Sequence, residues 1–246
     1  MNIRHAFLLL ILVFSVTPAW AGDVDHGPFD RLLKQNVKKG LLNYQGFVDN
    51  KPFLAYVEEI GKTDPTKLPS RAARLAFWIN AYNALTIHAV LPHWPGIESV
   101  SNIYPKFGFF DRAVHVIGGK KYSLNQIENK IIRPRFDEPR IHAALNCASI
   151  SCPPIQAFAF TAKKLDGQLD RAFGAFANDA SRNLIDVKSG QVRLSQIFNW
   201  YGKDFLKAGG PQKYIAPFVD DPKKKAVLMG AKKVDFLKYD WNLNKI

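Results

Sequence analysis

Apolar residues recur at helical spacing along several stretches of the chain. An apolar face repeats every three or four positions in residues 29–39, and Gly40 predicts the end of that helix. A second amphipathic helix is predicted over residues 51–60, with Asn50 as its N-cap. Residues 165–177 repeat the same pattern. Each of these segments is expected to bury one face against a common core.

The longest helical pattern covers residues 70–90 and ends before Pro92. Its segment 75–79 is apolar all round, which is typical of a helix buried on most sides. Asn80 and Asn83 follow inside this apolar run. A buried amide needs hydrogen-bonding partners, so these two residues either tie the helix to a neighbouring loop or belong to a functional site.

The remaining pattern predicts short strands that pair with their neighbours in sequence, between further helices. Hairpins are predicted for residues 113–117 with 120–122 and for residues 184–187 with 191–194, and a final strand for residues 234–239. Helices are predicted after Ser123, which forms a capping box with Gln126, after Ser195, and more weakly over residues 212–219. No βαβ alternation or internal repeat is present. The fold class is therefore α+β, a predominantly helical single domain with short, locally paired antiparallel strands.

The first residues have the pattern of a secretory signal peptide. Arg4 precedes an apolar run over residues 6–16, and an A-x-A cleavage site over residues 19–21 leads to Gly22. The apolar run is shorter than the roughly 20 residues that span a membrane, and no later segment is that long without charges. We expect a signal peptide over residues 1–21, a globular domain over residues 22–246 without a transmembrane span, and a periplasmic or secreted protein.

The chain is basic, with a formal net charge of +13. This charge favours contact with anionic partners such as lipid head groups or an acidic cell-wall polymer. The Lys and Arg residues are scattered, and no stripe of basic and aromatic residues or nucleic-acid-binding module is recognisable. We therefore expect an unknown peptide, protein or anionic cell-envelope component as partner, and no nucleic acid.

Residues 140–154 concentrate the reactive side chains of the chain. Both cysteines, Cys147 and Cys152, lie here together with His142 and Asn146, and a Pro-Pro pair ends the stretch. No other window gathers as many groups that can act as nucleophiles, transfer protons or bind a metal. The sequence thus predicts the place of a functional site more firmly than its reaction.

Three interpretations of the cysteine pair remain open. An exported protein favours a disulfide, whose small loop gives modest entropic stabilisation. A catalytic thiolate instead needs an imidazole such as His142, which Asn146, Asn80 or Asn83 could orient in a Cys-His-Asn group. The third interpretation is a metal site with Cys147, Cys152 and His142 as ligands, but no second cysteine pair completes it.

Other chemistries find little support in the sequence. The serines of this stretch lack a G-x-S-x-G context, the carboxylates are dispersed, and no phosphate-binding glycine loop is present. His88, on the long helix, and His115, in a strand, have the positions of partly buried structural histidines. We expect no cofactor.

Several motifs together resemble the domain-of-unknown-function family numbered 547. They are residues 77–86, residues 140–154, Ser123-Leu124 followed by Ile127-Glu128, residues 195–205, and residues 239–244, so that the resemblance covers about residues 69–244. The chain has Asn129 where members of that family commonly have a His after the Ile-Glu pair. This departure puts in doubt a role for a side chain at that position.

The resemblance implies a secreted or exported bacterial protein similar in plan to that family. A relationship to papain-like or transglutaminase-like thiol enzymes would make Cys147 or Cys152 the nucleophile and His142 the base. In this chain the His precedes the Cys, the reverse of the usual papain order, so the same geometry would need a different path through the fold.

Two hypotheses of function follow. The first is a thiol-dependent hydrolase or acyltransferase that acts on peptide or amide bonds, with catalytic candidates Cys147, Cys152, His142, Asn146, Asn80 and Asn83. The second is a non-catalytic binding module in which Cys147 and Cys152 form a structural disulfide, and the aromatic loop over residues 94–110 makes the contact with the help of the basic surface. An enzyme should show a thiol of depressed pKa in an open cleft, and a binding module an exposed apolar and aromatic surface.

Overall fold

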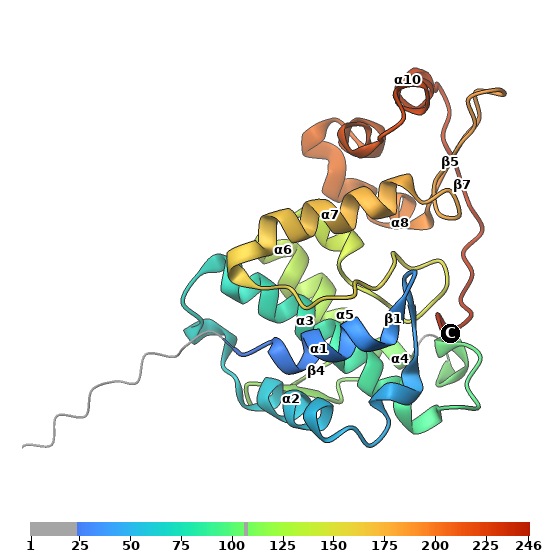
Figure 1. Ribbon diagram of the computed structural model, residues 1–246. Coiled ribbons are helices and arrows are strands. Elements are labelled where there is room, and N and C mark those ends of the chain that lie inside the picture. Colours follow the sequence, from blue (N-terminus) through green and yellow to red (C-terminus); the bar gives the residue numbers. More distant parts are fainter. Residues whose placement is uncertain (1–23, 106–107) are drawn as a thin grey trace, which may run out of the picture.

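The computed structural model describes residues 24–105 and 108–246, and Figure 1 shows their arrangement. The predicted signal peptide over residues 1–21 lies outside the described residues. The helices are α1 (Gly27–Asn36), α2 (Lys51–Lys62), α3 (Arg71–Val90), α4 (Gly108–Asp111), α5 (Leu124–Gln126), α6 (Arg133–Phe136), α7 (Leu165–Asn178), α8 (Gln196–Trp200), α9 (Pro211–Ile215) and α10 (Pro222–Gly230). The strands are β1 (Val37–Lys38), β2 (Leu41–Leu42), β3 (His115–Ile117), β4 (Lys120–Tyr122), β5 (Leu184–Ile185), β6 (Val192–Leu194) and β7 (Asp235–Phe236). The α+β, mainly helical prediction is confirmed.

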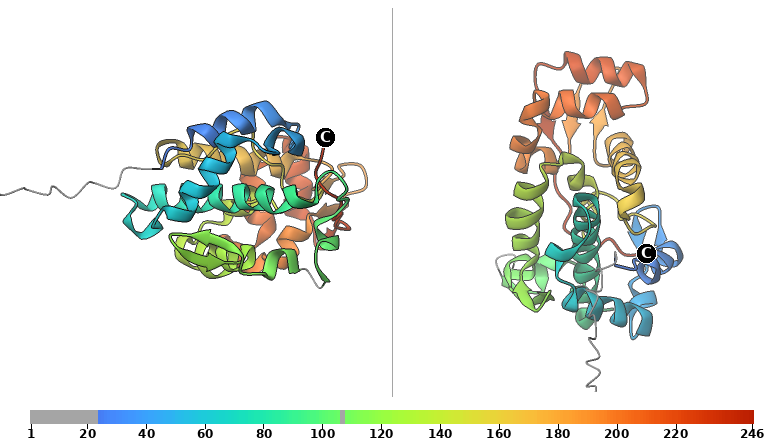
Figure 2. Two further views of the ribbon diagram at one scale, coloured as in Figure 1. Left: turned by 90° about the horizontal axis from the view of Figure 1, so that it is seen from below. Right: turned by 90° about the vertical axis from the view of Figure 1, so that its left-hand side faces the viewer.

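Helix α3 lies at the centre of the fold. Ser70 caps it by accepting a hydrogen bond from the backbone N–H of Ala73, and the helix is buried over most of its length. Figure 2 shows it between the segment of residues 124–136 and the gold helix α7. Its apolar surface on all sides explains this position, because only a helix covered by neighbours can keep such a surface from water.

The predicted helix over residues 29–39 ends earlier than its apolar pattern indicates. Helix α1 stops at Asn36, and the next residues form the β1–β2 hairpin instead. Its turn contains Lys39 and Gly40, both with positive φ. Glycine adopts this conformation at little cost, which explains why the chain reverses here.

Residues 124–136 form a continuous helical segment with an irregular centre. The predicted capping box of Ser123 and Gln126 is present at its start. The segment then changes to a π-helix, η6 (Ile127–Ile132), before α6. π-helical turns are rare and occur frequently at functional sites. Glu128 lies in this turn.

The strands form three small sheets. Both predicted hairpins are present as the antiparallel pairs β3–β4 and β5–β6. The final strand is shorter than predicted and pairs with β6 in parallel, about forty residues away in sequence. The period-2 pattern that predicts a strand carries no information on such a distant partner.

The end of the chain connects distant parts of the fold. After β7, residues 240–246 run down one side of the molecule to the C label in Figure 1. Leu243 donates a backbone hydrogen bond to Glu98, Asn244 donates one to Ala148, and Leu42 donates one to Asn244. One short segment therefore holds three regions that are far apart in the sequence.

None of the helices in the described part of the chain is long and apolar enough to cross a membrane.

Candidate functional site

The fold contains a cavity of about 500 Å³ whose wall includes both cysteines. It lies where five parts of the fold meet: α3, the π-helix, the stretch of residues 140–154, α8 and the segment that follows β7 (residues 237–246). The lining residues are Tyr82, Phe110, Asn125, Glu128, Asn129, His142, Leu145, Cys147, Cys152, Pro153, Ile197, Trp200, Tyr201, Tyr239 and Trp241. The predicted stretch of reactive side chains is therefore one wall of a largely aromatic cavity.

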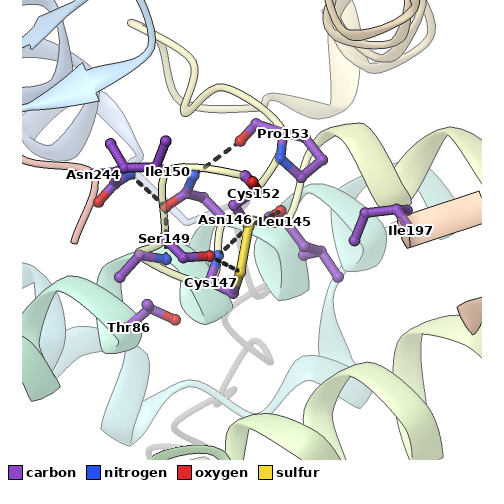
Figure 3. The surroundings of a disulfide bond; sticks show 12 residues. Thr86, Leu145, Asn146, Cys147, Ser149, Ile150, Cys152, Pro153, Ile197 and Asn244 are labelled. Atoms are coloured by element: carbon purple, nitrogen blue, oxygen red, sulfur yellow. Dashed lines mark hydrogen bonds between the residues drawn. A yellow bond between two sulfur atoms is a disulfide. The ribbon is translucent and has the colours of Figure 1, made fainter. Parts of the chain in front are cut away.

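Cys147 and Cys152 face each other within this wall and form a disulfide (Figure 3). Their Cα atoms are 6.1 Å apart. The intervening loop turns at Ala148, whose φ of 61° lies in the left-handed region that non-glycine residues rarely adopt. Asn146 supports the turn by accepting a hydrogen bond of 3.0 Å from the Ala148 N–H.

Two hydroxyl groups contact the sulfur of Cys147. The Ser149 Oγ and the Tyr239 Oη each lie 3.1 Å from its Sγ, and they lie 3.0 Å from each other. Burial raises the pKa of Tyr239, and its hydrogen bond with Ser149 offsets only part of that effect. Tyr239 therefore stays a neutral phenol beside the cysteine pair.

His142 is held in one orientation by a buried polar network. Its Nε2 lies 2.7 Å from the Asp204 Oδ2, and its ring stacks on Tyr201 with centroids 4.3 Å apart. Arg133 binds both carboxylate oxygens of Asp204, through Nε at 2.6 Å and Nη2 at 2.8 Å. Burial alone would raise the pKa of Asp204, but the hydrogen bonds from His142 and Arg133 outweigh it and lower this pKa below its ordinary value. Asp204 is thus a carboxylate that orients His142.

Glu128 is the only carboxylate among the described residues that line the cavity. The Tyr82 hydroxyl donates to its Oε2 at 3.3 Å. Burial, reinforced by the charge of Glu128, raises the pKa of both Tyr82 and Tyr201. Both phenols therefore remain protonated next to Glu128 and can donate hydrogen bonds to it.

A cluster of three aromatic rings forms another part of the wall. The Tyr239 and Trp241 centroids are 4.5 Å apart, and Trp200 lies 4.8 Å from Tyr239 and 5.9 Å from Trp241. Trp200 is 47% exposed, whereas most large apolar side chains are buried. An exposed ring at the opening of an aromatic cavity is available to a ligand.

The predicted site residues divide into two groups. His142, Cys147 and Cys152 line the same cavity. Asn80, Asn83 and Asn146 are buried outside it, and their amides bind backbone groups: Asn80 pairs with both the N–H and the C=O of Phe160, Asn83 binds the Ala144 C=O and the Asn146 N–H, and Asn146 binds the Pro153 C=O. The three asparagines thus hold backbone segments in place: Asn80 binds the segment at Phe160, and Asn83 and Asn146 bind the stretch of residues 140–154. A catalytic role for any of the six residues stays a prediction.

A metal site of Cys147, Cys152 and His142 requires several ligand side chains close enough to bind one ion. Among the residues that the structure describes, no group of three or more His, Cys, Asp or Glu side chains is placed to hold a metal ion.

Several residues of the site have no predicted role in the sequence. Asp204, Glu128, Tyr201 and Tyr239 were noted only as members of motifs, without a role. Their positions in the sequence range from 128 to 239, so no local spacing connects them with His142 or Cys147. The signal that could have identified them is their place in the motifs that carry the family resemblance, to which all four belong.

Comparison with protein-family models finds a match over part of the chain. The model described as "Protein of unknown function, DUF547" matches residues 65–177. The chain resembles the DUF547 family. The matched segment contains α3, Glu128 and the cysteine stretch, whereas Trp200, Asp204 and Tyr239 lie beyond it. The expected resemblance is thus confirmed, while the DUF547 description assigns no activity. Comparisons with curated proteins and with solved structures find no match.

Proposed function

We propose that this protein binds a small molecule, or a side chain of a peptide, in the cavity beside the Cys147–Cys152 disulfide. The observation that carries the proposal is the composition of the wall, in which aromatic rings surround a few polar groups. A cavity of about 500 Å³ is within the range of small-molecule sites, and such sites are mostly apolar with a small number of placed polar groups. The function is therefore that of a binding module with a structural disulfide.

The binding surface in this proposal is the cavity, to which the described part of the aromatic loop contributes Phe110. Within residues 94–110, Trp94 contacts Tyr44 and donates to Gln45, and Phe109 is buried. The exposed aromatic side chain is Trp200, at the cavity. Trp94 and Phe109 thus support the fold, while Phe110, at the end of the loop, belongs to the wall of the cavity.

A thiol-dependent hydrolase or acyltransferase acting on peptide or amide bonds is the second candidate. The observation in its favour is that His142, oriented by Asp204, lines the same cavity as Cys147. In a reduced protein, the hydroxyls of Ser149 and Tyr239 could donate hydrogen bonds to a Cys147 thiolate and lower its pKa. This candidate requires a free thiol, whereas the binding proposal requires the disulfide.

The proposed location is the periplasm or the exterior of the cell, and the proposed partners include an anionic component of the envelope. The support comes from the signal-peptide pattern at residues 1–21 and from the formal charge of +13. An oxidising compartment also favours the disulfide.

The redox state of the cysteines separates the two candidates. Protein purified from the periplasm should be alkylated with and without prior reduction, and its intact mass measured. We expect two blocked thiols that react only after reduction. A thiol that reacts rapidly at about pH 6 without reduction would instead support the enzyme, because only a thiolate of low pKa reacts there.

Ligand screening tests the cavity itself. A panel of amines, amino acids, peptides and neutral aromatic compounds should include at least one that raises the unfolding temperature of the wild type. Trp200→Ala should reduce this shift, while Leu206→Ala, which removes an even more exposed apolar side chain outside the cavity, should not. Ligands that stabilise both variants equally would place binding elsewhere and contradict the proposal.

A further inference from the structure

The cavity differs in charge from the rest of the molecule. The chain contains 34 Lys and Arg residues against 21 Asp and Glu residues. Nevertheless, among the residues that the structure describes, neither Lys nor Arg lines the cavity, whereas Glu128 does. The described wall of this aromatic cavity therefore carries a carboxylate and no Lys or Arg side chain, although the chain as a whole is basic. Such a charge favours a positively charged ligand.

The neighbouring charged groups leave the charge of Glu128 available. Arg133 lies near Glu128 but directs its guanidinium to Asp204, which it binds through two nitrogens. The Asp204 carboxylate is occupied by Arg133 and His142. The groups in contact with Glu128 itself are the neutral phenols of Tyr82 and Tyr201. No neighbouring cation therefore forms an ion pair with Glu128 in the described structure.

The aromatic rings complete a site for a cation. The faces of Trp and Tyr attract a positive charge through their quadrupole, most strongly when the cation is removed from water. Trp200, Tyr239 and Trp241 form one group of such rings, whereas the ring of Tyr201 is already in contact with His142 and with the Arg133 guanidinium. A carboxylate and several aromatic rings in one cavity are the combination that recognises alkylated ammonium groups.

We propose that the cavity binds the ammonium head of an organic cation, with Glu128 as counter-charge and the rings of Trp200, Tyr239 and Trp241 around its alkyl groups. This inference rests on the proposed binding function and names the class of ligand. A quaternary or alkylated ammonium fits better than a primary one, because the two phenols already occupy part of the hydrogen-bonding capacity of Glu128 and the wall is mainly apolar.

Three probes of the same shape but different charge test this inference by calorimetry. Choline carries a trimethylammonium head, 3,3-dimethylbutan-1-ol is its neutral counterpart, and 3,3-dimethylbutanoate is negatively charged. We expect wild-type protein to bind choline about tenfold more tightly than the alcohol. The carboxylate should bind most weakly, since Glu128 repels it.

Variants assign the charge preference to the site. Glu128→Gln should lower choline affinity to about that of the alcohol and leave the alcohol affinity unchanged. Trp200→Ala should weaken choline as well, and as a half-exposed residue it can be removed with little effect on folding. Glu59→Gln removes the same charge from the exposed face of α2 and should leave all affinities at wild-type values.

The outcomes distinguish this inference from the binding function. An alcohol that binds as tightly as choline and depends on Trp200 would keep the cavity as a binding site but overturn its preference for cations. If a folded Glu128→Gln protein kept its full affinity for choline, the assignment of Glu128 as counter-charge would be wrong. If none of the three probes binds, the proposal of an ammonium ligand is wrong. The proposed binding function is then tested only by the unfolding-temperature screen with the larger set of compounds.

Discussion

Asp204 shows how a single side chain sets the geometry of the site. It joins His142 and Arg133, two residues that the chain brings together from different helical turns. Asp204→Asn would remove the negative charge while nearly preserving the shape, and would leave His142 and Arg133 without their charged partner. We expect a loss of about 2–3 kcal/mol in the free energy of unfolding, measured by urea denaturation.

A matched substitution gives the control for Asp204. Asp137 also forms an ion pair, with Lys207, but their side chains are 63% and 80% exposed. Asp137→Asn should change stability by no more than about 0.5 kcal/mol, because exposed ion pairs contribute little. Equal losses in the two variants would show that the network around His142 is no stronger than a surface ion pair.

The properties of single residues could be predicted from the sequence where they depend on local chemistry, such as the need of a buried amide for hydrogen-bonding partners. Asn80 and Asn83 were expected to be buried amides in need of partners, and both bind backbone groups of other segments. The Asp204 partner of His142 lies 62 positions along the chain, so no spacing rule could connect them. The same holds for Glu128 and Tyr82, which meet only because two helical segments pack together.

At the scale of elements, the β3–β4 hairpin contains a histidine whose titration should affect folding. His115 is buried in β3, and its Nε2 has no hydrogen-bonding partner within the described part of the chain. Burial, together with the nearby His88, lowers the pKa of His115 to about 4. The folded protein therefore keeps this imidazole neutral at pH values where the unfolded chain, with an ordinary pKa of about 6.5, takes up a proton.

The sign of the resulting pH dependence follows from this difference. Stability should fall as pH decreases from about 6.5 to about 4, and the part due to His115 should level off near roughly 3 kcal/mol. Urea denaturation at a series of pH values in this window measures the effect. His115→Phe should remove most of the slope, whereas substitution of the exposed His93 should keep it. A slope that persists in His115→Phe would assign the effect to other groups.

The elements themselves were largely predictable, because most of them are specified by nearby residues. Helix α3 follows from its apolar run, and α5 starts at the capping box that Ser123 and Gln126 predict. The parallel pairing of β7 with β6 was not predictable from the pattern, since it joins segments that are distant in sequence. The π-helix around Glu128 was not predictable for another reason: its sequence, IENKII, has ordinary helical spacing.

At the scale of the whole molecule, the C-terminal segment is the element that joins the parts. Leu243 is buried, and Asn244 accepts a hydrogen bond of 2.6 Å from the Tyr44 hydroxyl while donating one to Asn146. This segment therefore connects the N-terminal hairpin with the loop that carries the disulfide. No local pattern indicates such a role for the last residues of a chain, which are poorly ordered in most domains.

Removal of residues 242–246 should consequently destabilise the whole domain and not only its end. The deletion removes the buried side chain of Leu243, leaves the buried Tyr44 hydroxyl without its partner and removes one of the hydrogen bonds of Asn146, so we expect the free energy of unfolding to fall by more than about 3 kcal/mol. Urea denaturation followed by tryptophan fluorescence and by far-UV circular dichroism should show one coincident transition, shifted to lower denaturant. Ile246→Ala, a change at a side chain that is 60% exposed, should stay within about 0.5 kcal/mol of wild type. Two separate transitions in the wild type would contradict the expectation of a single cooperative domain. A truncated protein as stable as the wild type would show that the disulfide loop holds its position without the C-terminal segment.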